Sequence, residues 1–324
     1  MVRILHACLA GAALVVTLAP AAAQPFPNRP ITLVVPLPPG GTNDIMARII
    51  GERMTKSLGQ QIVVENRAAG GSGTVATRQV ARSTPDGYTI LLSYTTTFAT
   101  GPSMYKNAGY DVRKDFAPIG LIAVSPSLVI ANKDFPVKTI PGLLAHIRKT
   151  NEPFQYGAPG IGSVNHLAAE LFAREAKIKL MTIPYKGSNS LVTDLVAGHI
   201  KMGFNPIPVS RGALEGGLIR ALAVTSARRS SQLPDVATMA EQGLPGFDVS
   251  LRYGLSAPAG TPAAVVDRLN QALNEALADQ AVIKRIRHEG AEPSPSTPQQ
   301  YAADIDAEET RWSAVVKDLG IVGN

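Results

Sequence analysis

The sequence predicts an α/β fold in two lobes, each a mostly parallel sheet flanked by helices, with a ligand cleft between the lobes. Strand and helix patterns alternate along the chain, which is typical of layered α/β folds. Two stretches, 31–50 and 154–172, share the order strand, Pro/Gly turn, helix. The chain of 324 residues is also long enough for two domains of ordinary size, each with its own core.

The first 23 residues have the pattern of a secretory signal peptide. Arg3 precedes a mostly apolar run over 4–18, and three alanines end the segment at Ala23. We expect cleavage after Ala23 and export to the periplasm, and no later stretch reaches the roughly 18 apolar residues of a membrane span. The only cysteine, Cys8, lies in this segment, so no disulfide is expected in the exported chain.

Strands and helices are expected in alternation through the rest of the chain. The predicted strands are 31–35, 62–65, 88–93, 121–124, 128–131, 179–183, 202–204, 219–224 and 251–255. The clearest helix spans 262–278, because Val266, Leu269, Leu273 and Leu277 recur at helical spacing after the Thr261-Pro262 start. A last helix is expected over 298–319, after a Pro/Ser-rich linker.

Two places have the pattern of crossings between lobes. Residues 124–127 (Val-Ser-Pro-Ser) interrupt consecutive strand patterns, and a strand returns within 246–256 before the last helices. We therefore expect a discontinuous first lobe, residues 24–124 with 249–324, and a second lobe of residues 125–248. Paired crossovers allow hinge motion, and ligands of such sheets bind beyond the carboxyl ends of the strands.

Both glycine turns occupy that position and have the composition of anion sites. Glycine lets a backbone approach a ligand closely, and the first N–H groups of a helix lack partners at the positive end of its dipole. Neither turn contains Lys or Arg, so backbone and hydroxyl donors would hold the anion. An ordinary turn capped by Thr42 or Asn43 is the alternative for the first turn. The second copy favours a shared ligand site.

Other polar residues follow predicted strands. Lys186, after the strand 179–183, is either solvated or part of the cleft. Thr95 is either a local cap or a ligand contact, and Asn205 is placed to face the same opening. His166, near a helix start, packs, hydrogen-bonds the turn or points a donor at the ligand.

Other chemistries find little support. The GxGxxA pattern at 71–76 lacks an acidic residue at the end of the following strand, so helix packing or a cleft wall is favoured over a dinucleotide. His166 and Glu170 lie one helical turn apart, but no further ligand has metal-site spacing. No GxSxG, GxxxxGK[ST] or HExxH motif occurs. The net charge of +6 is scattered without interleaved aromatics, which disfavours nucleic acid as a partner. We expect no metal, no cofactor and no catalytic residue.

Nine motifs in order resemble the Bug family, the substrate-binding proteins of tripartite tricarboxylate transporters. They are 31–44, 63–67 (VVENR), 85–88 (PDGY), 166–172 (HLAAELF), 184–187 (PYKG), 220–225 (RALAVT), 233–236 (LPDV), 243–246 (GLPG) and 257–262 (APAGTP). The resemblance covers essentially the whole exported chain. It implies a two-lobed, periplasmic-binding-protein-like receptor that closes on a small organic carboxylate and meets transporter membrane subunits transiently. We expect a monomer that does not span the membrane.

The resemblance also implies the ligand-binding residues. By position, the first carboxylate loop is Pro39, Gly40, Gly41 and Thr42, and the second is Gly160, Ile161, Gly162 and Ser163, with His166 nearby. Family members often have an aromatic residue at Leu37 and an acidic one at Asn205. The second departure favours a plain carboxylate over a ligand with an amino group.

Two other functions stay open at this point. One is a sensor subunit that binds the same ligand and reports to a membrane signalling protein. The other is an exported enzyme that uses His166, Lys186 or Tyr185 as acid or base, although no paired nucleophile and base has readable spacing.

Overall fold

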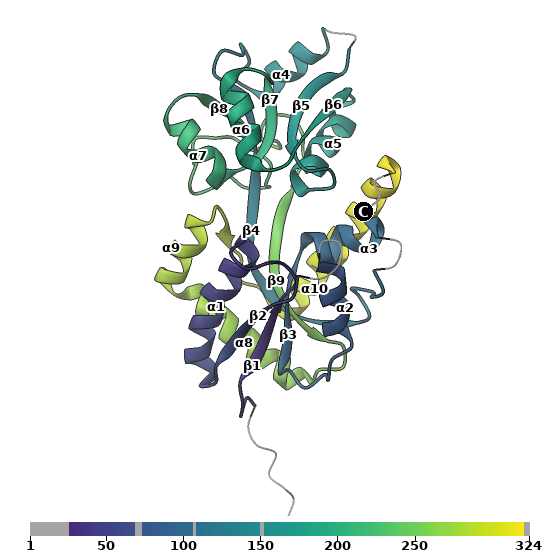
Figure 1. Ribbon diagram of the computed structural model, residues 1–324, viewed down its shortest axis with the longest axis vertical. Helices are drawn as coiled ribbons and strands as arrows, with labels where there is room; N and C mark the ends of the chain where they lie inside the picture. The colour runs from purple at the N-terminus through teal and green to yellow at the C-terminus, as the bar shows by residue number, and fades with distance from the viewer. Residues whose placement is uncertain (1–25, 69–72, 106–107, 150–151, 321–324) are drawn as a thin grey trace, which may run out of the picture.

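The computed structural model describes residues 26–68, 73–105, 108–149 and 152–320. They form two lobes joined by long strands (Figure 1). This confirms the predicted fold class. The predicted signal peptide, residues 1–23 with Cys8, lies outside the described residues. Among those that are described, no helix is both long and apolar enough to cross a membrane.

The first lobe is built on the strand order β2-β1-β3-β9-β4. Strand β1 pairs in parallel with β2 and β3, whereas β9 runs antiparallel to both β3 and β4. The strands of this lobe are β1 (Ile31–Val35), β2 (Ile62–Asn66), β3 (Thr89–Tyr94), β9 (Ser250–Pro258) and the short β10 (Glu292–Pro293). Its helices are α1 (Thr42–Leu58), α2 (Thr74–Ala81), the π-helical turn η2 (Thr96–Thr100), α3 (Gly101–Met104), α8 (Ala263–Ala278), α9 (Gln280–His288) and α10 (Pro298–Leu319).

The second lobe continues the sheet in the order β4-β7-β5-β6, and β8 also pairs with β4. Strand β5 is parallel to β6 and β7, but β4 is antiparallel to β7 and β8. The additional strands are β5 (Phe154–Pro159), β6 (Leu180–Tyr185), β7 (Met202–Pro206) and β8 (Ile219–Val224). The helices are α4 (Ile140–Ile147), α5 (Val164–Ala176), α6 (Ser188–Ala197) and α7 (Ile207–Glu215). The pairings of β1 with β2 and β3 and of β5 with β6 and β7 are therefore parallel, whereas every pairing that the two crossing strands, β4 and β9, make within the described residues is antiparallel.

Strand β4 (Phe116–Asn132) is one continuous strand of 17 residues, where the sequence predicts two. The interruption expected at Pro126 does not break it, because Pro126 stands where the pairing changes. It pairs with Ser250, the first residue of β9, and the pairing with β7 begins at Ser127. A proline has no N–H to give a ladder, so it is tolerated where one ladder ends and another begins.

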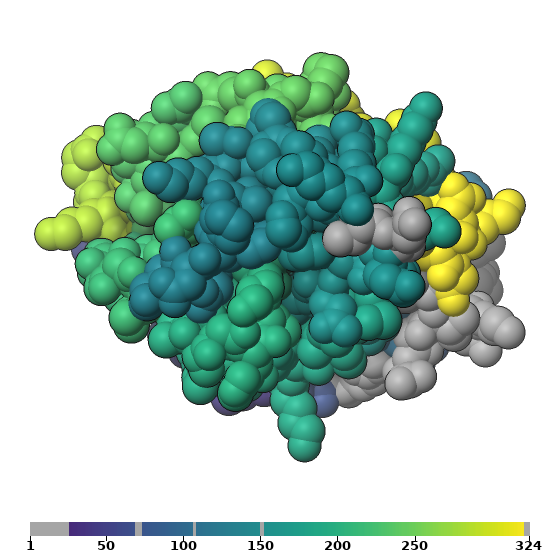
Figure 2. Space-filling model, turned by 90° about the horizontal axis from the view of Figure 1, so that it is seen from above, coloured from purple at the N-terminus to yellow at the C-terminus, as the bar shows by residue number. Residues whose placement is uncertain are grey.

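Helix α10 connects the two lobes outside the sheet. Trp312, Val315 and Val316 lie in one hydrophobic cluster with Phe172 and Phe204 of the second lobe. Viewed from the second-lobe end, the end of α10 emerges on one side and α9 on the opposite side (Figure 2). An ion pair of 2.7 Å joins Arg174 on α5 to Asp318 on α10. The lobes are therefore held together along the α10 side by apolar packing as well as by β4 and β9.

Candidate functional site

The two glycine turns follow β1 and β5, at the carboxyl ends of parallel strands. A Cβ atom built on Gly40, Gly41 or Gly160 meets no atom within 4 Å. Gly40 has a φ of +84° and Gly160 a φ of +86°, a region that other residues rarely adopt. Both turns therefore present bare backbone, as an anion that approaches main-chain amides requires.

The first turn already holds a carboxylate of its own chain. The N–H of Gly40 donates to Oδ2 of Asp44 at 2.9 Å, and Arg48 pairs with the same carboxylate at 3.0 Å. Burial opposes ionisation of Asp44, but the hydrogen bonds from Arg48 and Gly40 outweigh it and lower its pKa. Helix α1 has Gly41 as its N-cap and no side-chain cap. Within the described residues no side chain caps the N–H groups that follow Gly41, including that of Thr42, whereas the Gly40 amide is bonded to Asp44.

The second turn is capped by its own side chains. Ser163 accepts a hydrogen bond from the N–H of His166 at 3.2 Å and donates one to the carbonyl of Gly160 at 2.9 Å. The N–H of Gly162 donates to Nδ1 of His166 at 3.2 Å. Among the three predicted roles of His166, the structure shows the hydrogen bond to the turn. The amides of Gly162 and His166 are therefore committed to the protein.

His166 is buried and its accepting nitrogen requires a neutral ring. Burial lowers its pKa, and the nearby Glu170 carboxylate opposes this only partly. The distance from Nε2 to Oε1 of Glu170 is 3.7 Å, too long for a hydrogen bond. Among the described residues no group of three possible metal ligands occurs. At the tip of the same turn, Ile161 is 58% exposed, so an apolar side chain stands beside the amides.

Three predicted ligand residues lie away from the turns or are already bonded. Thr95 is buried, and its hydroxyl accepts the N–H of Arg252 at 2.7 Å, which favours the local structural role. Asn205 is fully buried and donates to Ser210 on α7 at 3.0 Å, while its Oδ1 has no hydrogen-bond partner among the described residues. That it faces the opening stays a prediction. Its position on β7 is opposite in alternation to Phe204, which packs toward α5. Lys186 is exposed.

Gly73 explains the glycine-rich motif that precedes α2. A Cβ atom there would lie 2.3 Å from the carbonyl oxygen of Pro36. Only glycine allows α2 to start so close to the first turn, which supports the packing role over a dinucleotide site. Gly71 and Ser72 of this motif lie outside the described residues.

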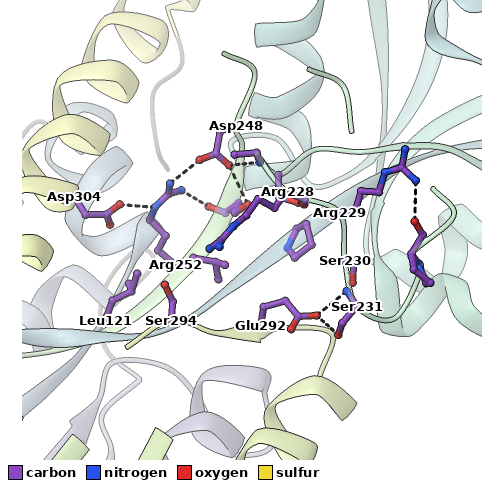
Figure 3. A pocket seen from close by; sticks show the side chains of 16 residues that line it. Leu121, Arg228, Arg229, Ser230, Ser231, Asp248, Arg252, Glu292, Ser294 and Asp304 are labelled. Atoms are coloured by element: carbon purple, nitrogen blue, oxygen red, sulfur yellow. Dashed lines mark hydrogen bonds and ion pairs between the residues drawn. The ribbon is translucent and has the colours of Figure 1, made fainter. Parts of the chain in front are cut away.

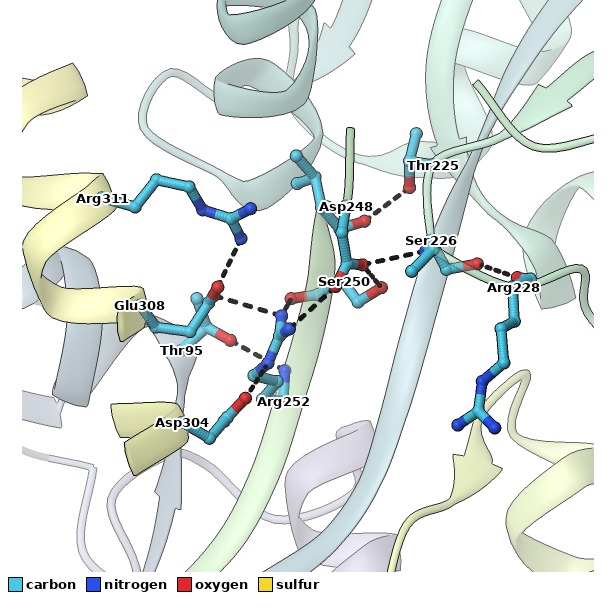
Figure 4. A network of polar contacts seen from close by, with 12 residues as sticks. Thr95, Thr225, Ser226, Arg228, Asp248, Ser250, Arg252, Asp304, Glu308 and Arg311 are labelled. Atoms are coloured by element: carbon cyan, nitrogen blue, oxygen red, sulfur yellow. Dashed lines mark hydrogen bonds and ion pairs between the residues drawn. The ribbon is translucent and has the colours of Figure 1, made fainter. Parts of the chain in front are cut away.

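An ionic cluster lies at the hinge, and none of the predicted site residues belongs to it. Arg252 on β9, with a side chain only 13% exposed, pairs with Asp248 at 3.1 Å, Asp304 at 3.0 Å and Glu308 at 3.2 Å (Figure 4). Burial disfavours its charge, but the carboxylates outweigh this and raise its pKa. A signal was present, because Asp304 and Glu308 stand four residues apart and so share one face of the predicted last helix.

A cavity of about 590 Å³ lies beside this cluster, lined by both lobes (Figure 3). It includes none of the predicted ligand residues. Ser127 of β4 donates to Asn165 at the start of α5, whereas Val124 and Pro126 line the cavity. Since side chains alternate along a strand, the cavity lies on the face of β4 turned away from the second glycine turn. A second groove, of about 610 Å³, lies between α1, α7 and α9.

Fold and turns together define a two-lobed solute-binding protein. A family model described as "Tripartite tricarboxylate transporter family receptor" matches residues 46–321, and the chain belongs to that family. The resemblance drawn from the nine motifs is thereby confirmed. Protein BugT of Bordetella pertussis is 36% identical over 93% of each chain.

Solved structures agree with this assignment. The R. palustris protein Rpa4515, solved with adipate, is 37% identical, with a TM-score of 0.74 over 92% of this chain and 99% of that one. A TctC solute-binding protein from Polaromonas, solved with no ligand, is 26% identical, yet its TM-score is 0.82 over 90% and 99%. The less similar sequence without ligand therefore superposes better.

Proposed function

We propose that this chain is a periplasmic receptor that captures a small organic carboxylate between its lobes and delivers it to the membrane subunits of a tripartite tricarboxylate-type transporter. The observation that carries the proposal is the first glycine turn. It binds the Asp44 carboxylate through the Gly40 amide, and beyond Gly41 the start of α1 has no side-chain cap. A site with this chemistry suits carboxylate oxygens.

The proposed site joins donors from both lobes. In the first lobe they are the amides that follow Gly41 and the hydroxyl of Thr42. In the second lobe they are the backbone amides of Ile161 and Ser163, with the ammonium group of Lys186 at the rim. The proposed lobes are residues 24–124 with 249–324, and residues 125–248, after removal of residues 1–23. Capture involves no chemical step.

Binding energy sets how many contacts are needed. Micromolar affinity corresponds to about 8 kcal/mol, and a helix start contributes at most about 2 kcal/mol. Several charge-assisted hydrogen bonds of about 1.5–3 kcal/mol each must be added. Closure supplies them by bringing the second turn onto a ligand that rests on the first.

Calorimetric titration of the exported protein with adipate, malate, succinate and citrate tests the proposal. At least one acid is expected to bind, and adipamide, which has the shape of adipate without its charges, is the control for that acid. Ligand at about 100 times its Kd should also stabilise the fold by roughly 2.7 kcal/mol in thermal unfolding. No heat at millimolar acid, or equal binding of the neutral amide, would contradict carboxylate capture. NMR of the recovered acid is expected to show it unchanged.

A further inference from the structure

The cavity behind the hinge strands, here called the hinge pocket, has the size and position of a small-molecule site. Small-molecule sites usually occupy about 300–1,000 Å³ and often lie between domains; this one is about 590 Å³. Its lining includes Leu121, Val124 and Pro126 of β4, Arg228 of the second lobe, and Arg252 and Asp304 of the first (Figure 3). An apolar floor thus lies between charged walls.

The second-lobe wall carries an unused cation. Arg229 is paired with Glu241, but no ion pair or hydrogen bond of the Arg228 guanidinium occurs within the described part of the chain. The view in Figure 4 shows the Arg228 guanidinium pointing away from Ser226, with no marked contact. Five N–H donors are therefore free to bind an acceptor.

The ionic cluster around Arg252, beside the hinge pocket, holds more carboxyl groups than guanidinium groups. Asp248, Asp304 and Glu308 all pair with Arg252. Within the described ranges of the chain, Glu308 also pairs with Arg311, whereas Asp248 and Asp304 have no second guanidinium partner. Three carboxyl groups thus share two guanidinium groups, and Asp248 and Asp304 have Arg252 in common.

We propose that the hinge pocket binds a small zwitterion with an apolar body, such as a neutral α-amino acid. Its carboxylate pairs with Arg228, its ammonium group lies toward Asp304, and its side chain covers Val124 and Pro126. A simple anion would be repelled by the carboxylates of one wall, and a simple cation would be repelled by Arg228. Only a ligand with both charges complements the two walls at once. This site is separate from the carboxylate site proposed at the glycine turns.

Calorimetry with L-leucine as the probe tests the proposal on the whole exported protein. L-Leucinamide lacks the carboxylate and 4-methylpentanoate lacks the ammonium group, so each is expected to bind about tenfold more weakly or worse than leucine. Arg228→Gln is expected to weaken leucine binding to a similar degree. Arg82→Gln, which removes the same charge from an exposed site on the first lobe, should leave it unchanged.

Three outcomes would overturn the proposal: no leucine binding at about 10 mM, leucine affinity unchanged in Arg228→Gln, or 4-methylpentanoate binding as tightly as leucine. A further variant separates the two sites. Gly41→Val should weaken carboxylate binding at the turns and leave leucine affinity unchanged. Loss of leucine binding in Gly41→Val would place leucine at the turns and overturn the hinge-pocket proposal. If the titrations with adipate, malate, succinate and citrate show no binding, the leucine titrations still test the hinge pocket independently.

Discussion

At the residue scale, the two glycine turns differ in where their amide hydrogens go. In the first turn Asp44 takes the Gly40 N–H and leaves the start of α1 open. In the second turn His166 and Ser163 take the N–H groups of Gly162 and His166. We therefore expect the first turn to be the stronger part of the proposed carboxylate site, with the second contributing mainly when the lobes close.

Valine at Gly41 and at Gly160 should act on different properties. Gly41 has a φ of −82° and open space around it, so Gly41→Val folds with a loss of about 1 kcal/mol. The added side chain blocks the amides and should weaken carboxylate binding about tenfold or more. Gly160→Val places a branched residue at a φ of +86° and should cost more stability, about 1–3 kcal/mol. Titration and urea unfolding measure the two effects, and wild-type affinity in Gly41→Val would place the ligand elsewhere.

His166 should make stability depend on pH. Burial lowers its folded pKa below the ordinary 6.5, so below about pH 6.5 the unfolded chain takes up a proton that the folded protein does not. The contribution of His166 to the free energy of unfolding is complete above pH 6.5. It declines as pH falls toward the folded pKa, by at most about 1.4 kcal/mol per pH unit. In His166→Gln this part of the decline should vanish. Unfolding measured from pH 7.5 to 5.5 checks it, with His199→Gln as the exposed control; equal slopes in wild type and His166→Gln would contradict it.

At the element scale, the helix starts show which ends are satisfied internally. Ser163 caps α5, and Thr297 with Gln300 forms a capping box at α10. Helix α1 begins at Gly41 without a side-chain cap. Where a helix end is left open at the end of a strand in an α/β sheet, its amides are available to a ligand.

Removing each of two caps separates stability from binding. Ser163→Ala and Thr297→Ala should each cost about 1 kcal/mol, because each exposes a helix N–H. Only Ser163→Ala should also weaken carboxylate binding, since its hydroxyl holds the Gly160 carbonyl. Urea unfolding and titration of both variants give the comparison. Unchanged affinity in Ser163→Ala would mean that the second turn does not contact the ligand.

At the scale of the whole molecule, α10 limits how the lobes move. Its Trp312 lies in a buried cluster that contains residues of both lobes, and Asp304 and Glu308 pair with Arg252 on β9. If the lobes close on a ligand as proposed, we expect the contact of α10 with the second lobe to stay in place.

Loss of the Trp312 side chain tests the packing of α10 against the second lobe. Trp312 is fully buried, so Trp312→Ala should cost about 3–5 kcal/mol. Leu319→Ala, at a residue 39% exposed near the same helix end, should change stability little. Urea unfolding gives both values. A loss below about 1 kcal/mol in Trp312→Ala would mean that this contact does not stabilise the arrangement of the lobes.

Much of the fold could be predicted because its signals are local. The last helix is expected over 298–319 and observed over Pro298–Leu319, since cap residues and apolar spacing lie within a few residues of each other. The continuity of β4 could not be predicted, because Pro126 is a strand breaker unless the ladder partner changes at that point. The burial of Asn205 likewise depends on α7, which packs over it.

The sequence by itself determined the alternation of strands and helices, both glycine turns and the family of receptors, because each depends on residues close together in the chain. Tertiary structure decided which turn amides stay open, the buried positions of Thr95 and Asn205, the Arg252 cluster and the hinge pocket. These depend on side chains that come from distant segments of both lobes. Which of these side chains meet depends on how the sheets and α10 pack. Periodicity and spacing along the chain do not predict that packing.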